Sequence, residues 1–205
     1  MSEPIRTLAS LDLVAGNPAL DFANTINSRV TPEHDYLASF GDLVSWTERV
    51  GVAPMVLPQV SVDPDATARV LRQALGLREA IYRSFSAIAA REAPPPADVR
   101  RILRAYGIAV GRASLGVGDT GADLRWPTPT KPSRVLDPIA YAAGELLLAS
   151  DPPPVKECPG CGWLFVDRSR NGSRRWCDMQ TCGSRDKMRR YYRTRRGTTG
   201  RARQD

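Results

Sequence analysis

The sequence predicts a mostly helical chain in two parts: a helical N-terminal domain with one small β-hairpin, and a small C-terminal module that holds every cysteine. Three observations carry this prediction. Apolar residues recur at helical spacing through most of residues 1–150, "DPPP" at 151–154 separates the two parts, and all four cysteines lie between residues 158 and 182. With 205 residues, of which 42% are hydrophobic and 25% charged, the chain can bury one substantial core.

Residues 1–150 carry the pattern of helices joined by short turns. The longest predicted helix runs from Pro64 to Arg91, with Asp63 as its N-cap and a broad apolar face. The run "APPP" at 93–96 ends it. Between Arg112 and Pro127, short alternating runs around Gly-Asp-Thr-Gly predict the β-hairpin. The other helices are expected at 18–28, 39–51, 97–110 and from 133 or 137 to 150.

Charge is distributed unevenly along the chain. The net charge is +7, yet residues 155–205 hold 14 Lys or Arg against 5 Asp or Glu, while residues 1–154 hold 15 against 17. This local surplus of 9 favours a polyanionic partner. No apolar run approaches the roughly 20 residues of a membrane helix, and the N-terminus lacks the pattern of a secretory signal. We therefore expect a cytoplasmic protein with no membrane partner.

The four cysteines form two close pairs, Cys158-x2-Cys161 and Cys177-x4-Cys182, which fifteen residues separate. This spacing is typical of a zinc site with four thiolate ligands, and such a site leaves no coordination position for water or substrate. Disulfides are rare in the cytosol, and a redox Cys-x2-Cys pair does not need a second pair. The sequence therefore predicts one structural Zn²⁺ bound by all four cysteines.

The cysteine-rich segment resembles the CGNR zinc finger. It shares that family's two cysteine pairs, its Asp-x-Ser-x-Asn segment at 167–171, its Arg-Arg-Trp-Cys run at 174–177 and its Cys-Gly at 182–183. The run "LDFANT" at 20–25, with Trp46 further on, resembles the ABATE domain, a helical domain that usually precedes this finger. Proteins of this kind are described as putative stress-induced bacterial transcription regulators, which implies that the finger binds DNA and that the protein associates with the nucleoid.

One position departs from the finger motif, because its asparagine is Ser184 in this chain. If that asparagine reads adenine, serine cannot replace it well, since only a carboxamide bonds adenine in a bidentate way. If it caps the following helix, serine is an adequate substitute. The N-cap preferences favour the capping role, and both alternatives stay open at this point.

Residues 183–196 are expected to form a helix that starts at the metal site. Its residues Met188, Tyr191 and Tyr192 predict an apolar face directed at the zinc module or the larger domain. Its other face is rich in arginine, which is either a solvated surface or a nucleic-acid-binding one, and the excess of arginine over lysine favours the second. The residues predicted to contact duplex DNA are Arg174, Arg175, Arg185, Lys187, Arg189, Arg190, Arg193 and Arg196.

The runner-up function is a zinc-stabilised module that binds protein or RNA without sequence-specific DNA recognition. The aromatic side chains of Trp163, Phe165 and Trp176 are expected to pack around the metal in preference to stacking on exposed bases. In the N-terminal part, the aromatic residues are expected to form core and not a ligand cage. These are Phe22, Trp46, Tyr82, Phe85 and Tyr106.

Residues 1–150 show no phosphate-binding loop and no nucleophile motif, and His34 is the only histidine, so no enzymatic activity is expected. Asp21 and Asn24 are expected to cap a helix or to bond a buried loop. We expect this domain to sense a small-molecule effector or to mediate homodimerisation. The predicted division is a helical domain at 1–150, a proline linker at 151–154, the finger at 155–196 and a disordered basic tail at 197–205.

Overall fold

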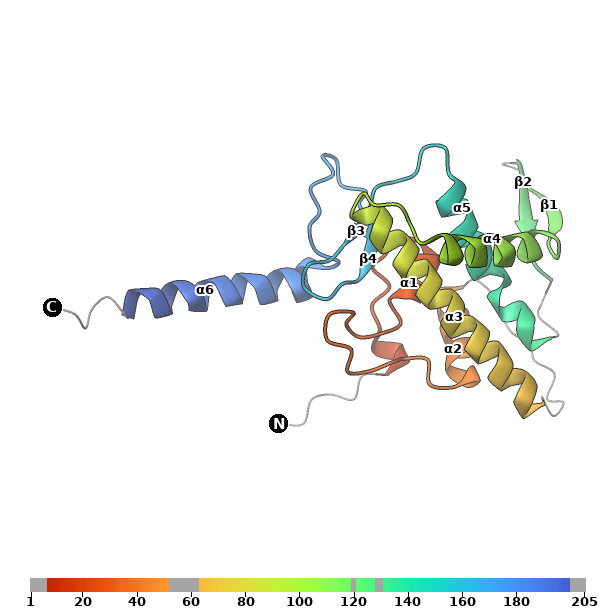
Figure 1. The fold of residues 1–205 in the computed structure, drawn as a ribbon, viewed down its shortest axis with the longest axis horizontal. Coiled ribbons are helices and arrows are strands. Elements are labelled where there is room, and N and C mark those ends of the chain that lie inside the picture. Colours follow the sequence, from red (N-terminus) through yellow and green to blue (C-terminus); the bar gives the residue numbers. More distant parts are fainter. Residues whose placement is uncertain (1–6, 52–62, 119–120, 128–130, 200–205) are drawn as a thin grey trace.

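Helix α3 (Pro64–Ala89) is the longest element of the computed structural model, and most other helices of the N-terminal part pack against it (Figure 1). The structure describes residues 7–51, 63–118, 121–127 and 131–199. Asp63 caps α3 by accepting a hydrogen bond from the Asp65 amide, and Pro64 occupies its first position, as predicted. Its buried side chains recur every three or four residues, so one continuous face of α3 lines the core.

The predicted fold class is confirmed. Helices α1 (Pro18–Ala23), α2 (Phe40–Val50) and α4 (Pro96–Val110) each contact α3, and α5 (Asp137–Leu148) packs on α1 and α4. Strands β1 (Ser114–Gly118) and β2 (Gly121–Arg125) form the predicted antiparallel hairpin, with Ser114 opposite Arg125. Two 3-10 turns complete this part, η1 (Leu8–Ser10) and η2 (Pro132–Leu136).

Helix α1 is shorter than the sequence predicted, because it ends at Ala23 and not near Ser28. The chain turns away after Ala23, and the amide of Thr25 donates to the carbonyl of Phe22 at 3.2 Å. Asn24 does not continue the helix, because its buried carboxamide bonds the main chain of a strand 140 residues further on. A tertiary contact therefore overrides the local helical pattern at this point.

The C-terminal module begins with two short antiparallel strands, β3 (Val155–Glu157) and β4 (Leu164–Val166). Leu164 and Val166 are buried in the same core as α1, α3 and α5. The amide of Val166 donates to the carbonyl of Ala15 at 2.8 Å. The proline-rich segment at 151–154 therefore separates the two parts in sequence, while their apolar side chains form one continuous core.

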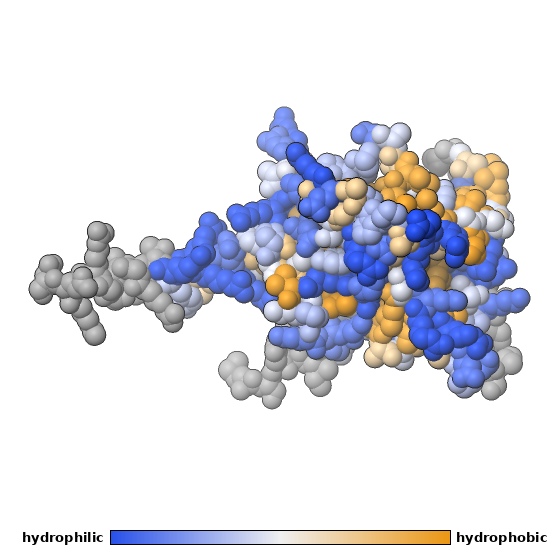
Figure 2. All heavy atoms as spheres, viewed as in Figure 1, coloured by the Kyte–Doolittle hydropathy of each residue, from blue (hydrophilic) through white to orange (hydrophobic). Residues whose placement is uncertain are grey.

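A π-helical turn, η3 (Met179–Gly183), leads into helix α6 (Ser184–Thr199), which projects away from the rest of the molecule (Figure 1). The main contact of α6 is with η3. Hydrophilic side chains cover most of its described part (Figure 2). Among the helices of the described ranges, none is both long and apolar enough to cross a membrane.

Two predictions about the C-terminal helix are corrected. The face formed by Met188, Tyr191 and Tyr192 is not buried, since these residues are 50%, 52% and 56% exposed. Strand β4 makes the apolar contact with the N-terminal core in their place. Residues 197–199, which the sequence assigned to a disordered tail, continue α6, and residues 200–205 lie outside the described ranges.

Candidate metal centre and basic helix

The four cysteines converge on one buried point. Their sulfur atoms all lie within 4.8 Å of one another, and all four side chains are buried. The Sγ atoms of Cys161 and Cys177 are 3.5 Å apart, and those of Cys177 and Cys182 are 3.6 Å apart, so the thiols are free and not disulfide-bonded. Sulfurs at the corners of a tetrahedron around Zn²⁺ would be about 3.8 Å apart, given a Zn–S distance of about 2.3 Å. The donor set therefore fits a tetrahedral four-thiolate metal site, as the sequence predicted.

The turn between Cys158 and Cys161 is built by main-chain bonds. The amide of Gly162 donates to the carbonyl of Cys158 at 2.8 Å, and the amide of Trp163 donates to the sulfur of Cys161. Gly162 has φ of +74°, and a Cβ there would lie 2.7 Å from the Cβ of Arg29. Glycine is thus required for two reasons, the left-handed turn and the close approach of the N-terminal domain.

The electrostatics of the cluster call for a cation. Contact with the Cys158 sulfur, and then burial, raise the pKa of the Cys161 and Cys177 thiols. Four buried thiols this close together cannot all ionise alone, because each thiolate would repel the others. A divalent cation reverses this effect, since it deprotonates the thiols that bind it.

The segment that follows α1 holds the cysteine turn in place. The carboxamide of Asn24 donates to the carbonyl of Leu164 at 2.9 Å and accepts from the amide of the same residue at 3.0 Å. The indole of Trp163 donates to the carbonyl of Ile26 at 2.7 Å, and the amide of Arg29 donates to the carbonyl of Cys161 at 2.7 Å. The N-terminal domain therefore bonds the main chain at the metal ligand Cys161 and again at Leu164, three residues further on. We call residues 24–29 the docking segment.

Side chains of helix α3 hold the docking segment in place. Arg78, which is buried, forms two bonds of 2.7 Å with the carboxylate of Asp35 and one of 3.2 Å with the hydroxyl of Thr25. The neighbouring Glu79 accepts from the guanidinium of Arg29 at 2.7 Å. Charge-assisted bonds of this kind are stronger than neutral ones, so α3 sets the position of the docking segment.

Asp21 has a structural role, as expected. Its carboxylate accepts a hydrogen bond at 3.0 Å from the amide of Ala15, the same residue whose carbonyl accepts from Val166 of β4. Burial raises the pKa of Asp21 to about 6. Asn24 likewise has the structural role that the sequence favoured, although its partner is a strand and not a loop.

Asp167 organises the loop between the two cysteine pairs. It accepts from the ammonium of Lys156 at 2.6 Å, from the amide and hydroxyl of Ser169 at 2.9 and 2.6 Å, and from the amide of Arg174 at 3.1 Å. Lys156, and then Ser169, hold the pKa of Asp167 well below its usual range. The acidic and hydroxyl positions of the Asp-x-Ser-x-Asn segment are therefore structural, whereas Asn171 is exposed.

Both motifs thus meet in one site. A family model described as "ABATE: Putative stress-induced transcription regulator" matches residues 16–150, about two thirds of the chain. The chain belongs to the ABATE family. The CGNR zinc finger model matches residues 155–196, which confirms the resemblance found in the sequence. A search of the curated proteins finds no match.

Within the CGNR finger, Arg174 has a different role from the predicted one. Its half-buried guanidinium donates to the carbonyls of Trp176 at 3.1 Å and of Val14 at 3.1 Å, and also bonds the carbonyl of Cys177. It also lies over the ring of Phe165 at 4.4 Å. These bonds turn Arg174 inward, so it joins the finger to the ABATE domain. Its neighbour Arg175 remains exposed beside Trp176.

The aromatic residues of the finger pack as predicted. Phe165 is fully buried in the cysteine cluster, and Trp163 and Trp176 pack against that cluster half-buried. In the ABATE domain, Phe22 and Trp46 are buried with their rings 5.2 Å apart. Phe85 is also buried, whereas Tyr82 and Tyr106 are half-buried at the edge of the core.

Ser184 does not cap the final helix. Asp178 does so, because its carboxylate accepts from the amide of Thr181 at 2.8 Å ahead of η3. The helical chain therefore begins at Met179, five residues before Ser184. The exposed hydroxyl of Ser184 donates to the carbonyl of Met179 at 3.1 Å, so it supports the π-helical turn.

Helix α6 carries most of the residues predicted to contact DNA. Arg185, Arg189 and Arg193 are exposed, and none of them forms an ion pair with an acidic residue of the described ranges. Arg190 differs, since it pairs with Asp186 at 3.0 Å. Lys187 is exposed, and the side chain of Arg196 lies outside the described residues. We call Arg185, Arg189 and Arg193 the basic face.

The sequence analysis missed part of this surface. A shallow groove on η3 and α6 joins the basic face to polar side chains of the metal-proximal turn, and it is lined by Gln180, Thr181, Ser184, Arg185, Met188, Arg189 and Tyr192. The helix predicted from the sequence starts at Gly183 and so leaves out Gln180 and Thr181, whereas the helical chain begins with η3 at Met179. Their position between Cys177 and Cys182 is the signal that could have found them.

Proposed function

We propose that this chain is a DNA-binding transcription regulator, in which a structural zinc ion holds the start of α6 and the basic face of α6 contacts the duplex. The observation that carries the proposal is the exposure of Arg185, Arg189 and Arg193 on a helix that projects from the metal centre. Several exposed guanidinium groups on one helix favour phosphate and guanine contacts.

Zinc is the metal that the donor set supports best. Four buried cysteine sulfurs in a near-tetrahedral cluster suit Zn²⁺, and a site closed by four protein ligands is structural. Cys177 and Cys182 flank the Asp178 cap of η3. A bound metal would therefore fix the direction in which α6 leaves the finger.

The dimensions and chemistry of α6 suit the major groove. Its 16 residues span about 24 Å, and the major groove admits a helix of this width. Arginines four residues apart repel one another, and neighbouring phosphates would remove that cost. The groove on η3 and α6 adds amide and hydroxyl groups that can bond base edges.

Selection from a random duplex pool tests the proposal. We expect the metal-loaded chain to enrich one duplex sequence, with an affinity that falls steeply with salt. Replacing Arg185, Arg189 and Arg193 by Gln should weaken binding and reduce the salt slope by about 3. Arg125→Gln, on strand β2 outside the finger, is the matched control and should change neither. If no duplex is enriched and the triple variant binds nucleic acid as the wild type does, the proposal is wrong.

A second candidate is an RNA- or protein-binding module, which the exposed Tyr191 and Tyr192 favour. Their rings are 5.7 Å apart, and more than half of each side chain is exposed. Aromatic side chains of this kind stack on unpaired bases. Competition between single-stranded RNA and the selected duplex separates the two candidates, since an RNA module would prefer the single strand and lose affinity on Tyr192→Ala.

We propose no catalytic role. His34 is exposed, and its ring meets the ring of Tyr36 edge-on at 4.8 Å. Duplex binding should therefore survive His34→Ala. Metal analysis of freshly purified, reduced protein should give about one zinc per chain. Protein without metal under these conditions would refute the zinc assignment.

A further inference from the structure

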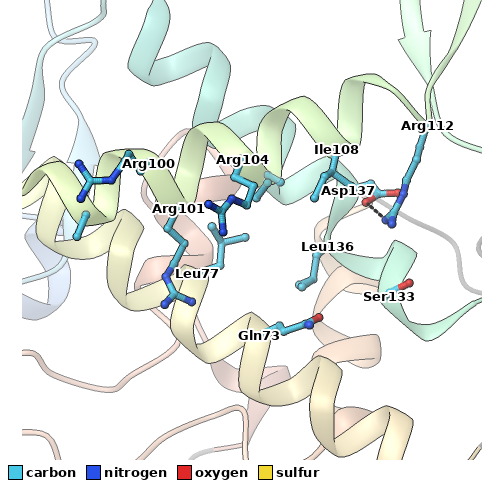
Figure 3. Close-up of a pocket in the computed structure, with 13 residues that line it drawn as sticks. Gln73, Leu77, Arg100, Arg101, Arg104, Ile108, Arg112, Ser133, Leu136 and Asp137 are labelled. Carbon is cyan, nitrogen blue, oxygen red and sulfur yellow. Dashed lines mark hydrogen bonds and ion pairs between the residues drawn. The ribbon is translucent and has the colours of Figure 1, made fainter.

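A pocket opens in the ABATE domain on the side of α3 that faces α4 and η2. It has a volume of about 560 Å³, and α3, α4 and the start of α5 form its walls. Arg101 and Arg104 extend from α4 across this space toward α3, with Gln73 and Leu136 facing them (Figure 3). We call this pocket the arginine pocket.

The charges in the arginine pocket are not balanced. Four arginines line it, at positions 100, 101, 104 and 112, against the single carboxylate of Asp137. Asp137 is already paired with Arg112 at 3.0 Å. Within the described residues, no ion pair or hydrogen bond joins the side chains of Arg100, Arg101 or Arg104 to an acidic group. Guanidinium groups held side by side in this way repel one another, and an anion between them removes the repulsion.

The side of the pocket that holds Asp137 and Arg112 has a second feature that points to a ligand (Figure 3). Asp137 is 4% exposed, and its Oδ2 atom is buried without a hydrogen-bond partner. Buried polar atoms are nearly always bonded, so an unpartnered carboxylate oxygen in a pocket wall calls for a donor. Burial also raises the pKa of Asp137, in spite of the nearby Arg112. A ligand hydroxyl or amine would satisfy this oxygen.

The remaining wall is apolar and closely fitted. Leu77, Leu136 and Ala140 are among the apolar residues that line it. Arg101 lies directly against α3, where a Cβ on Gly76 would come within 2.8 Å of its Nη1 atom. The glycine therefore leaves room for the guanidinium in the wall of the pocket.

We propose that the arginine pocket binds a small organic anion. Its carboxylate or phosphate group would lie between Arg101 and Arg104, its apolar body on Leu77 and Leu136, and a hydroxyl or amine on Asp137. A pocket with an apolar wall and a few convergent polar groups is the usual form of a small-molecule site. That this anion acts as the effector of the protein rests on the proposed regulatory function, whereas its binding does not.

The position of the pocket suits an effector. Leu77 lies in α3 next to Arg78 and Glu79, the two residues that fix the docking segment against the finger. One helix thus contacts the arginine pocket and the segment that holds the metal turn. A ligand that changes the position of α3 would also move the docking segment, and with it the Arg29 amide that bonds the carbonyl of Cys161.

Titration calorimetry on the full metal-loaded chain tests the proposal, with phenyl phosphate and benzoate as anionic probes and benzyl alcohol as the neutral control. We expect saturable binding of at least one anion and none of the alcohol. In the double variant Arg101→Gln, Arg104→Gln the affinity should fall about tenfold or more, because two charge-assisted contacts are lost. Arg125→Gln should bind as the wild type does.

A crossed comparison separates this proposal from the proposed DNA binding. Arg185→Gln, Arg189→Gln should lose duplex affinity and keep the anion affinity, while the Arg101 and Arg104 variant should do the reverse. The proposal is overturned if neither anion binds saturably up to millimolar concentration, or if both bind the double variant equally well. It is also overturned if the double variant weakens duplex binding as much as the α6 variant, because the arginines would then belong to the nucleic-acid surface.

Discussion

The two halves of the finger differ in how they are held. Residues 155–166, the docked half, bury Leu164, Phe165 and Val166 and are bonded by the docking segment. Helix α6, the projecting half, leaves Met188 and Tyr192 at least half exposed and contacts mainly η3. The metal site lies between the two, since Cys158 and Cys161 belong to the docked side and Cys182 to the start of the projecting side.

This difference indicates which half of the finger is held by the ABATE domain and which half is not. The free energy that holds the docked half comes from shared core and buried main-chain bonds, so this half should unfold together with the ABATE domain. The projecting half has its main contact with η3, so η3 and a bound metal would orient it. Four predictions test this contrast, and they follow in order of expected effect.

Metal removal should destabilise the ABATE domain as well as the finger. Structural zinc contributes an apparent binding free energy of about 10–16 kcal/mol in isolated zinc fingers, and here part of the finger completes the ABATE core. Thermal unfolding followed by circular dichroism should shift by about 2–4 °C per kcal/mol lost, both after chelation and in Cys177→Ser. Restoring zinc to the chelated wild type should reverse the shift. If the midpoint of the helical unfolding transition does not change when the metal is removed, the two parts unfold independently.

Asn24→Ala should be among the most costly polar substitutions in the chain. It leaves a buried amide and a buried carbonyl of Leu164 without partners, at about 1–3 kcal/mol each, or about 2–6 kcal/mol together. Asn17→Ala is the matched control, because it removes the N-cap of the same helix at about 0.5–2 kcal/mol. Urea denaturation measures both, and equal losses would contradict the importance of the docking contact.

Asp21→Asn should remove part of the pH dependence of stability. Burial raises the folded-state pKa of Asp21 to about 6 from 3.8, so the folded chain binds more protons than the unfolded one between about pH 4 and 6. The wild type therefore loses up to about 3 kcal/mol at this site as pH rises through that window. The variant keeps an oxygen for the Ala15 amide and avoids this loss. The difference between the melting temperatures of the two proteins, measured from pH 4 to 7, should grow with pH. A constant difference would contradict the assignment.

Tyr192→Ala on α6 should change stability least, by no more than about 0.5 kcal/mol, because the side chain is 56% exposed. Urea denaturation of the variant and the wild type measures the difference. A loss above about 1 kcal/mol would mean that α6 packs on the body of the protein in solution, and the contrast between the two halves would then fail.

Local patterns predicted the metal ligands and most helices. The spacing of the four cysteines is set by the geometry of one ion, and the caps at Asn17 and Asp63 act within three residues. The direction of α6 could not be predicted in the same way. An apolar stripe at Met188 and Tyr192 indicates burial only if a partner surface is free, and β4 already occupies the N-terminal core.

The partners of two side chains, Arg174 and Asn24, show a second limit of sequence patterns. Arg174 lies in an arginine-rich run and resembles its neighbours in sequence, yet three main-chain carbonyls take up its guanidinium. Asn24 bonds a peptide group 140 residues away, and a peptide group leaves no complementary residue in the sequence. Contacts between a side chain and distant main chain are therefore invisible to pattern and spacing, although a buried carboxamide at the end of a short helix is a hint.

The Asn24 contact also bears on how such proteins can be recombined. A carboxamide that pairs with the carbonyl and amide of Leu164 recognises an extended backbone and imposes no particular side chain on its partner. A finger with another α6 could therefore be grafted onto this ABATE domain, provided that its second strand fills the space of Leu164 and Val166. The junction would stay constant while the surface offered by α6 is exchanged.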